Sequence, residues 1–232
     1  MTETIVGKLY LIPTPIGNLK DITQRALETL EAVDVIACED TRRSGQLLAN
    51  FGITKKKISY FEHNEAGRVP QIIAMLQEGQ SVAVISDGGS PGLSDPAFRV
   101  VTAAIENGIT IEALPGATAA IPALTASGMP TDRFLFEGFL PVKSGKRKKR
   151  LEALLEFPHT IVIYESVHRI KKSLIDIAEV FGSRQICIAR EISKLHEEYI
   201  RGTAEELAER AEEITAKGEF VIVIAGFQEE KG

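Results

Sequence analysis

The stretch Ile85-Ser86-Asp87-Gly88-Gly89-Ser90-Pro91-Gly92-Leu93-Ser94-Asp95-Pro96 indicates more about the fold and the function of this chain than any other segment. It follows the apolar run 81–85, which is short and bounded by turn residues, as buried strands are. Its three glycines permit a positive φ and let a ligand approach the backbone closely. Asp95 suits a helix N-cap and Pro96 suits a first helical turn, so we expect a helix to begin directly after this loop.

The position of this loop predicts a ligand site. Asp87 is expected at the carboxyl end of the strand, which is the edge where open α/β sheets bind their ligands. A carboxylate beside a glycine loop suits a ligand with hydroxyls and a flat ring, such as a nucleoside. An ordinary strand-to-helix turn is the structural alternative, since short glycine motifs often occur without a ligand.

Strand and helix signals alternate on both sides of this loop as far as residue 116. Asp21 is the expected cap of the first helix, and Gly52 is expected to end the second. The alternation predicts an α/β fold with a largely parallel sheet. We expect strands at 8–12, 35–38, 57–61, 81–85 and 109–114, and helices at 22–33, 43–51, 69–77 and 97–106.

The second half of the chain begins with small apolar residues at 117–129, which predict a helix that joins two halves. The order of the later elements predicts a mixed sheet with antiparallel pairs. We therefore expect two α/β domains, residues 1–117 with the glycine loop and residues 118–232 with the mixed sheet. The later strands are expected at 133–139, 160–164, 185–189 and 219–225, and the helices at 147–155, 170–181 and 204–216.

The composition is typical of a globular protein, with 44% hydrophobic and 25% charged residues in a chain of 232. Two cysteines lie in apolar runs, so we expect neither a disulfide nor a metal site. We see no leader and no apolar run of ~20 residues, so we expect a cytoplasmic protein without a membrane partner. A net charge of −5 confines any RNA or DNA binding to a local patch, and we expect no DNA partner.

A second loop, Pro13-Thr14-Pro15-Ile16-Gly17-Asn18, follows the first expected strand. Two prolines stiffen this loop and Gly17 lets it turn. It has neither the glycine spacing of a dinucleotide site nor the lysine of a phosphate-binding loop. The combination suits a nucleoside ligand with little phosphate, such as S-adenosylmethionine, and a rigid structural turn is the alternative.

Charged residues follow three further expected strands. Glu39 and Asp40 come directly after the strand at 35–38, and charges also follow the strands at 160–164 and 185–189. Such residues can form the polar rim of a cleft, and the two groups in the second half can form one shared site. Helix caps and paired Arg–Glu side chains are the structural alternatives.

The segment 143–150 carries six positive charges in eight residues. In an acidic protein this cluster produces a strong local field, and each phosphate that it neutralises releases counterions. The cluster therefore predicts contact with an RNA backbone, with a solvated loop and helix start as the alternative. Cations in a first helical turn oppose the helix macrodipole, and this local cost favours the functional interpretation.

Taken in order, these motifs resemble the tetrapyrrole methylase superfamily. They are most similar to its ribosomal branch, whose members use S-adenosylmethionine to methylate a cytidine 2′-hydroxyl in small-subunit (16S) rRNA. So many linked motifs in one order are not expected by chance. The motifs lie at 11–19, 39–42, 63–65, 86–96, 114–128, 138–141, 164–169, 190–194 with 196–197, and 218–221.

The resemblance implies two α/β domains with the cofactor in the cleft between them, and a homodimer. The implied substrate is a decoding-centre cytidine of small-subunit rRNA, in an assembled ribosomal subunit. Family members usually continue past position 232 with a further C-terminal segment. The resemblance therefore leaves open whether residues 1–232 make all the contacts to RNA. The implied cofactor-binding residues are Pro15, Gly17, Asp87, Gly88, Gly89, Pro91, Gly92, Thr118, Ala119, Tyr164 and Ala189.

Methyl transfer to a ribose hydroxyl needs an in-line approach in a dry site and help in removing the hydroxyl proton. Glu191 and Lys194 are the first candidates for this catalytic task, because their motif is polar, follows a strand and belongs to the ribosomal-branch match. Asp40 and Glu39 are the second candidates. The cations expected on the RNA backbone are Lys143, Lys146, Arg147, Lys148, Lys149 and Arg150.

Two other functions compete with this interpretation. A small-molecule methyltransferase for a tetrapyrrole needs an apolar trough more than a cationic loop, so the basic cluster argues against it. A non-catalytic RNA-binding assembly factor with a degenerate cofactor pocket is a different class. The complete Asp87-Gly88-Gly89 and Pro15-Ile16-Gly17 loops argue against that class.

Overall fold

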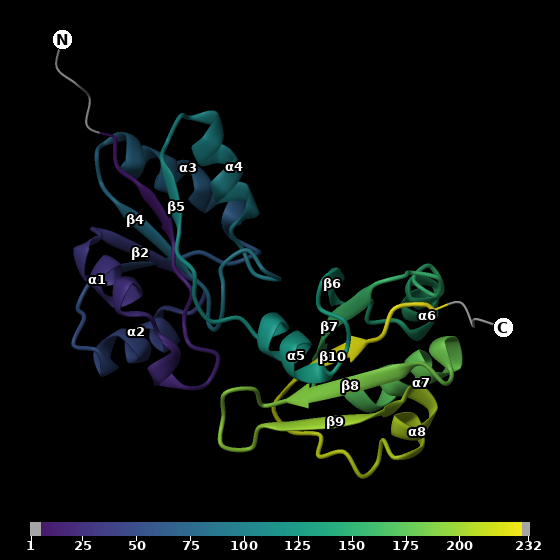
Figure 1. Ribbon diagram of the computed structural model, residues 1–232. Coiled ribbons are helices and arrows are strands. Elements are labelled where there is room, and N and C mark those ends of the chain that lie inside the picture. The colour runs from purple at the N-terminus through teal and green to yellow at the C-terminus, as the bar shows by residue number, and fades with distance from the viewer. Residues whose placement is uncertain (1–5, 229–232) are drawn as a thin grey trace. The chain divides into compact units, whose positions relative to one another are not determined.

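The computed structural model describes residues 6–228 and divides into two compact units, residues 1–118 and 119–232 (Figure 1). This division falls one residue after the boundary expected from the sequence. Residues 1–5 and 229–232 lie outside the described part, and they include the N-terminal stretch that was examined for a leader. Each unit is built around its own sheet and is described by itself.

The first unit holds a five-stranded sheet in which all four strand pairings are parallel, as the sequence predicted. The strand order is β3-β2-β4-β1-β5, so β4 lies in the centre with β2 and β1 beside it. The strands are β1 (Leu9–Leu11), β2 (Val35–Cys38), β3 (Lys56–Ser59), β4 (Val82–Ile85) and β5 (Ile111–Ala113).

Helices cover both faces of this sheet (Figure 1). Along β4, Val82 and Val84 pack with α3 (Glu65–Gln77) and α4 (Phe98–Glu106). The alternate residues, Ala83 and Ile85, pack with α1 (Gln24–Ala32) and α2 (Thr41–Asn50). A strand buried on both faces needs apolar residues throughout, and this explains the unbroken apolar run before the glycine loop.

Two helix starts in this unit differ from the prediction. Asp21 belongs to a short 3-10 turn (Leu19–Asp21), and α1 is capped instead by Thr23, whose hydroxyl accepts the Ala26 amide at 3.0 Å. The prediction that Asp95 and Pro96 begin a helix was wrong, because α4 starts at Phe98 and has no side-chain cap.

The second unit holds a five-stranded mixed sheet with the order β6-β7-β10-β8-β9. The β6–β7 pair is parallel and the other three pairs are antiparallel, which confirms the expected mixed sheet. The prediction missed the edge strand β9, whose residues are polar or only half-buried. The strands are β6 (Phe134–Phe139), β7 (Thr160–Ser166), β8 (Gln185–Arg190), β9 (Glu198–Thr203) and β10 (Glu219–Ile224).

The two faces of this second sheet are covered unequally. Ile186 and Ile188 of β8 belong to a core with α6 (Ser144–Glu152), α7 (Ile170–Phe181) and α8 (Ala204–Glu209). The alternate face is contacted by α5 (Ala120–Ser127), the first element of the unit (Figure 1). No helix within residues 6–228 has the length and apolarity that crossing a bilayer requires.

The basic helix α6 begins three residues earlier than expected. Its first turn contains Lys146 and Arg147, with Lys143 at the N-cap, while Lys149 and Arg150 lie in the last turn. Cations are favourable at a helix C-terminus. The argument that these cations carry a cost from the helix dipole was therefore wrong for Lys149 and Arg150.

Candidate functional site

Four loops follow parallel strands of the first unit and meet at the carboxyl edge of its sheet. Residues 12–18 follow β1, Glu39 and Asp40 follow β2, the glycine loop (residues 86–95) follows β4, and residues 114–118 follow β5. Because β4 lies between β2 and β1, its loop can touch the loops on both sides.

The first loop and the glycine loop are joined by an antiparallel bridge between Thr14 and Gly89. Each backbone N–H donates to the other residue's carbonyl, at 2.9 and 2.8 Å. The Thr14 hydroxyl also donates to the Ser86 carbonyl at 3.0 Å, and the Ser86 hydroxyl donates to the Gly89 carbonyl at 3.1 Å. Thr14 is buried and fixes both loops. Sequence reasoning did not identify it as a site residue, because its partners lie more than 70 residues away along the chain.

The glycine loop needs glycine at two of its three positions. Gly89 has a φ of +94° and Gly92 a φ of +86°, both in the region that other residues avoid. Gly88 has no positive φ, and a Cβ added there would lie 3.4 Å from the Pro15 carbonyl oxygen. The Ser90 hydroxyl donates to the Ala117 carbonyl at 3.1 Å and so ties the loop after β5 to the same edge.

Three carboxylates gather at this edge and form what we call the acid cluster: Glu39, Asp87 and Asp95. The Asp87 amide donates to Glu39 Oε1 at 3.2 Å, and Arg43 pairs with Asp87 Oδ2 at 3.0 Å. Asp40 contributes differently, since its carboxylate caps α2 by accepting the Arg42 amide at 2.8 Å. Asp40 therefore has the structural role that the sequence left open.

The acid cluster shifts the pKa of two of its members upward. Burial, followed by the charges of Asp95 and Asp87, raises the pKa of Glu39 to about 7. Burial also raises the pKa of Asp95 to about 6, with a smaller contribution from the Asp87 charge. Near neutral pH a proton can therefore be bound or released at this edge. The sequence placed Asp95 in a helix cap, although the convergence of loops after parallel strands could have predicted its true neighbourhood.

The residues at this edge fit the nucleoside sulfonium that the sequence predicted. The Thr118 hydroxyl oxygen is buried and has no hydrogen-bond partner in the described part of the chain, so it is free for a ligand. Pro15, Gly17 and Pro91 belong to the loops that line this edge, and a cation suits its acids. Among residues 6–228, no group of three acidic, histidine or cysteine side chains could hold a metal ion.

The remaining predicted cofactor residues belong to the second unit. Ala119 precedes α5, and the Tyr164 hydroxyl accepts the Ala120 amide at 3.2 Å, so Tyr164 holds the start of that helix. The Tyr164 ring also packs edge-on against Phe136, with centroids 4.9 Å apart. Ala189 is fully buried within β8. Tyr164 and Ala189 therefore shape the sheet face that α5 contacts.

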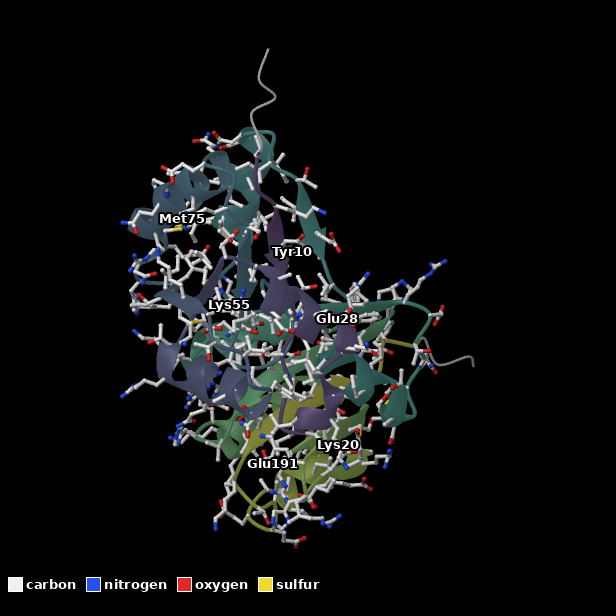
Figure 2. The ribbon with its side chains drawn as sticks, turned by 90° about the vertical axis from the view of Figure 1, so that its left-hand side faces the viewer. Tyr10, Lys20, Glu28, Lys55, Met75 and Glu191 are labelled. Atoms are coloured by element: carbon white, nitrogen blue, oxygen red, sulfur yellow. The ribbon has the colours of Figure 1, made fainter. Side chains whose placement is uncertain are left out.

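Glu191 and Lys194 form an ion pair at 2.8 Å in the loop between β8 and β9 (Glu191 is labelled in Figure 2). Burial alone would raise the pKa of Glu191, but hydrogen bonds from Lys194 and the Glu219 amide outweigh it and hold this pKa below its usual value. Burial likewise opposes a raised pKa at Lys194, yet its bonds to Glu191 and Glu219 prevail. Both groups therefore stay charged near neutral pH, which suits an ionic clamp better than a proton acceptor.

The basic cluster divides into paired and unpaired cations. Arg147 is only 3% exposed, and its Nε donates to Asp176 at 2.6 Å. The expectation that Arg147 meets RNA was therefore wrong, because its guanidinium is turned into the protein. Arg150 pairs with Glu137 at 2.6 Å and Lys148 pairs with Glu179. Within the basic cluster, the exposed cations that form no ion pair with another described residue are Lys143, Lys146 and Lys149.

The family model of tetrapyrrole (corrin/porphyrin) methylases matches residues 8–208 of this chain. Proteins called ribosomal RNA small subunit methyltransferase I are similar over nearly the whole chain. The Synechocystis protein is 49% identical over 222 residues, covering 95% of this chain and 80% of its own. The Mesorhizobium japonicum protein is 51% identical, covering 93% and 74%, and that of Escherichia coli O157:H7 is 48% identical, covering 95% and 78%.

Solved structures show the same fold. A uroporphyrin-III C-methyltransferase from Thermus thermophilus aligns with a TM-score of 0.65 at 23% identity, covering 94% of both chains. A cobalt precorrin-4 methyltransferase aligns with a TM-score of 0.66 at 21% identity, also covering 94% of both. The chain therefore belongs to the tetrapyrrole methylase family, in the branch of its ribosomal RNA small subunit methyltransferase I relatives.

Proposed function

We propose that this protein transfers a methyl group from S-adenosylmethionine to the ribose 2′-hydroxyl of a cytidine in small-subunit rRNA, at the decoding centre. The observation that carries this proposal is identity of 48–51% to three rRNA methyltransferases over more than nine-tenths of the chain. The less similar tetrapyrrole enzymes support the fold only. The joined loops and the acid cluster at the carboxyl edge of the first sheet support the methyl-transfer reaction.

The cofactor would be held by the joined loops of the first unit. When bound, S-adenosylmethionine supplies an electrophilic methyl group on a positively charged sulfur. The bridge between Thr14 and Gly89 fixes the main chain of both loops, and the Thr118 hydroxyl offers a free polar group. When Glu39 and Asp95 ionise, the acid cluster gains negative charge, which favours a cationic ligand.

Glu39 is best suited of the four predicted catalytic groups to accept the hydroxyl proton. A general base works best when its pKa lies near the working pH, and the pKa of Glu39 is raised to about 7. Its Oε1 accepts the Asp87 amide, so the carboxylate is anchored to the glycine loop. Asp40 caps α2, and Glu191 and Lys194 form an ion pair with each other.

Lys143, Lys146 and Lys149 would provide the grip on the RNA backbone. All three side chains are exposed; Lys143 is the N-cap of α6, and Lys146 and Lys149 lie within the helix three residues apart. These three lysines form no ion pair with acids of the described chain, whereas Arg147, Lys148 and Arg150 each do. We further propose that the protein works in the bacterial cytoplasm as a homodimer, on rRNA within an assembled small subunit.

A methyl-transfer assay tests this function. Purified protein is incubated with tritiated S-adenosylmethionine and one of three substrates: small subunits that lack the modification, free rRNA, or a porphyrinoid. We expect label in the rRNA of assembled subunits, at a cytidine whose 3′ linkage becomes resistant to alkali. Label in the porphyrinoid would favour the small-molecule alternative, and RNA binding without any label would favour an assembly factor.

A further inference from the structure

The carboxyl end of β6 carries an exposed aromatic ring. Phe139, the last residue of β6, is 52% exposed, and Val142, three residues further along the chain, is 75% exposed. A single exposed phenylalanine carries little information by itself, because apolar side chains are common on protein surfaces. This ring is different, because a local irregularity of the strand directs it and because unpaired cations follow it along the chain.

A β-bulge sets the direction of the Phe139 side chain. Along a regular strand, residues 136 and 139 would lie on opposite faces of the sheet, because side chains alternate. The register between β6 and β7 shifts between Phe136 and Gly138, and Gly138 has a φ of +71°. Both phenylalanine rings therefore pack edge-on against Tyr164, with centroid distances of 4.9 Å for Phe136 and 5.8 Å for Phe139. Bulges that redirect a side chain in this way concentrate beside functional sites.

Two arginine side chains fix the segment that follows Phe139. Arg169 donates to the Leu140 carbonyl at 3.1 Å, and its guanidinium carbon lies 6.0 Å from the centre of the Phe139 ring. Arg147, which is buried, donates to the Val142 carbonyl at 3.0 Å. The exposed ring is therefore held in a fixed place relative to the start of α6.

The unpaired cations of the basic cluster begin four residues after this ring. Four residues of chain span at most about 14 Å, so the Cα atom of Lys143 lies within that distance of the Cα atom of Phe139. Lys146 follows in the first turn of α6, and neither lysine forms an ion pair with another described residue. All of these residues belong to the second unit, which holds both β6 and α6 (Figure 1).

This combination matches the way in which proteins bind single-stranded nucleic acid. In such proteins cations follow the phosphates, and aromatic side chains stack on the bases. In a duplex the bases are already paired and stacked, so an exposed ring has little to contact there. An aromatic ring beside free lysines therefore suits an unpaired strand better than a helix of RNA.

We propose that Phe139 is a stacking platform for an unpaired base of the RNA, beside phosphates that Lys143 and Lys146 bind; this inference rests on the proposed function. The ring is already held by Tyr164 and Arg169, so it loses little conformational freedom when a base stacks on it. A second copy of this chain is the competing occupant. A two-fold interface centred here would bring the same lysines close together, and their like charges disfavour it.

The first test places a fluorescent reporter at the platform. The chain contains no tryptophan, so Phe139→Trp gives the intact protein a single indole. Its emission is followed with three probes: single-stranded RNA of about ten nucleotides, the same strand in a duplex, and inorganic polyphosphate, which has charge without bases. We expect strong quenching by the single strand and little by the other two, because only unpaired bases can stack on the ring.

Phe134→Trp is the matched control, because Phe134 is 40% exposed and lies at the opposite end of the same strand. Its emission should stay unchanged with all three probes. The platform is overturned if RNA quenches both variants equally, if polyphosphate quenches Phe139→Trp as strongly as RNA does, or if bound single-stranded RNA leaves its emission unchanged.

The second test measures affinity for the same single strand. Phe139→Ala should weaken binding about tenfold, as when 1.4 kcal/mol of stacking is lost. Phe139→Leu should weaken it as well, since leucine keeps an apolar side chain but has no ring, and Phe139→Tyr should restore it. Phe134→Ala should bind as the wild type does. The melting temperature and the affinity for S-adenosylhomocysteine should stay unchanged in all of these variants.

Three results of this second test would overturn the platform: wild-type RNA affinity in Phe139→Ala, a change only in its sedimentation, which would indicate a protein contact, or a change only in its affinity for S-adenosylhomocysteine. The methyl-transfer assay on small subunits separates this outcome from failure of the proposed function. If the wild type labels rRNA while Phe139→Ala binds RNA normally, the platform alone is wrong. A wild type that labels no RNA would refute the proposed function, and the platform with it.

Discussion

The half-buried acids at the edge of the first sheet and the buried acids of the second unit differ in their partners. In the second unit the buried acids have cations beside them, with Asp176 held by Arg147 at 2.6 Å and Glu165 by Arg169 at 2.7 Å. At the carboxyl edge of the first sheet, Glu39 and Asp95 form no ion pair within the described part of the chain, and their pKa values rise to about 7 and about 6.

This difference separates charges that support the fold from charges that remain available to a ligand. A paired buried acid stabilises only while its partner is present, and an unpaired one lowers the stability of the free protein when it ionises. The second unit uses its charges to fix helices and loops. The first leaves carboxylates in place for a ligand that carries positive charge.

The largest effect is expected at the buried pair of the second unit. Arg147→Ala leaves Asp176 buried without its guanidinium partner, and such a loss costs about 3–5 kcal/mol in the free energy of unfolding. Urea denaturation measures it. Lys146→Ala, one residue earlier on the exposed side, should change stability by less than about 0.5 kcal/mol. Equal effects of the two substitutions would remove the distinction between paired and unpaired cations.

The next effect concerns the unpaired acid Glu39 and depends on pH. Its folded pKa is about 7 and its ordinary value is 4.5, so the folded state binds more protons between these values. The free energy of unfolding should therefore fall as pH rises from about 4.5 to 7. Solvent screens this half-buried carboxylate, so we expect a fall of about 1 kcal/mol, well below the full 1.36 kcal/mol for each pKa unit.

Glu39→Gln should flatten this decline, because glutamine does not titrate. Urea unfolding at several values between pH 4.5 and 8 measures it for both proteins. Glu62→Gln, at an exposed position of the same unit, provides the matched control and should leave the decline in place. Parallel pH profiles for the wild type and Glu39→Gln would show that the pKa of Glu39 is not raised in the folded protein.

An effect of similar size separates two neighbouring glycines of the first unit. Gly89→Ala places a Cβ on a backbone with positive φ, which costs about 1–2 kcal/mol and strains the bridge to Thr14. We expect calorimetry to show at least about tenfold weaker binding of S-adenosylhomocysteine, the change that 1.4 kcal/mol produces. Gly88→Ala, with no positive φ, is the control and should bind nearly as the wild type does. If Gly88→Ala weakened S-adenosylhomocysteine binding more than Gly89→Ala, the absence of a side chain at residue 88 would matter more for binding than the backbone conformation at residue 89.

The smallest effect on the fold is expected for the three unpaired lysines of the second unit. Replacing Lys143, Lys146 and Lys149 together by alanine should leave stability within about 0.5 kcal/mol. It should reduce the slope of log affinity for rRNA against log salt by about 2, as loss of three contacts to single-stranded phosphates would. Lys148→Ala, which removes a cation paired with Glu179, is the control and should leave the slope unchanged.

The sequence predicted the main architecture because its strongest signals are local. The apolar run before Asp87 is buried on both faces, and the order of strands and helices leads directly to a parallel sheet. The edge strand β9 was missed because its residues are polar or half-buried. The order of the strands within each sheet also depends on long-range pairing, which no short motif reveals.

Within the candidate site, sequence reasoning found the loops but not their internal contacts. The glycine loop, Glu39 and Asp87 were all identified, since each directly follows a strand. The partners of Arg147 and Glu191 were not, because they lie 29 and 28 residues away along the chain. A cluster of cations or a polar motif does not reveal which of its members face inward, and that depends on distant acids such as Asp176.

The bridge between Thr14 and Gly89 has a consequence for redesign. The two loops follow adjacent strands, and two backbone bonds and the Thr14 hydroxyl bond join them. The Ser86 hydroxyl bond holds the glycine loop itself. A chimera that takes only one of the two loops from a relative would pair that loop with a partner loop of different sequence, and so would disturb the hydrogen bonds between them. Exchange of ligand preference between members of the family should therefore require residues 13–18 and 86–95 to be transplanted as a single cassette.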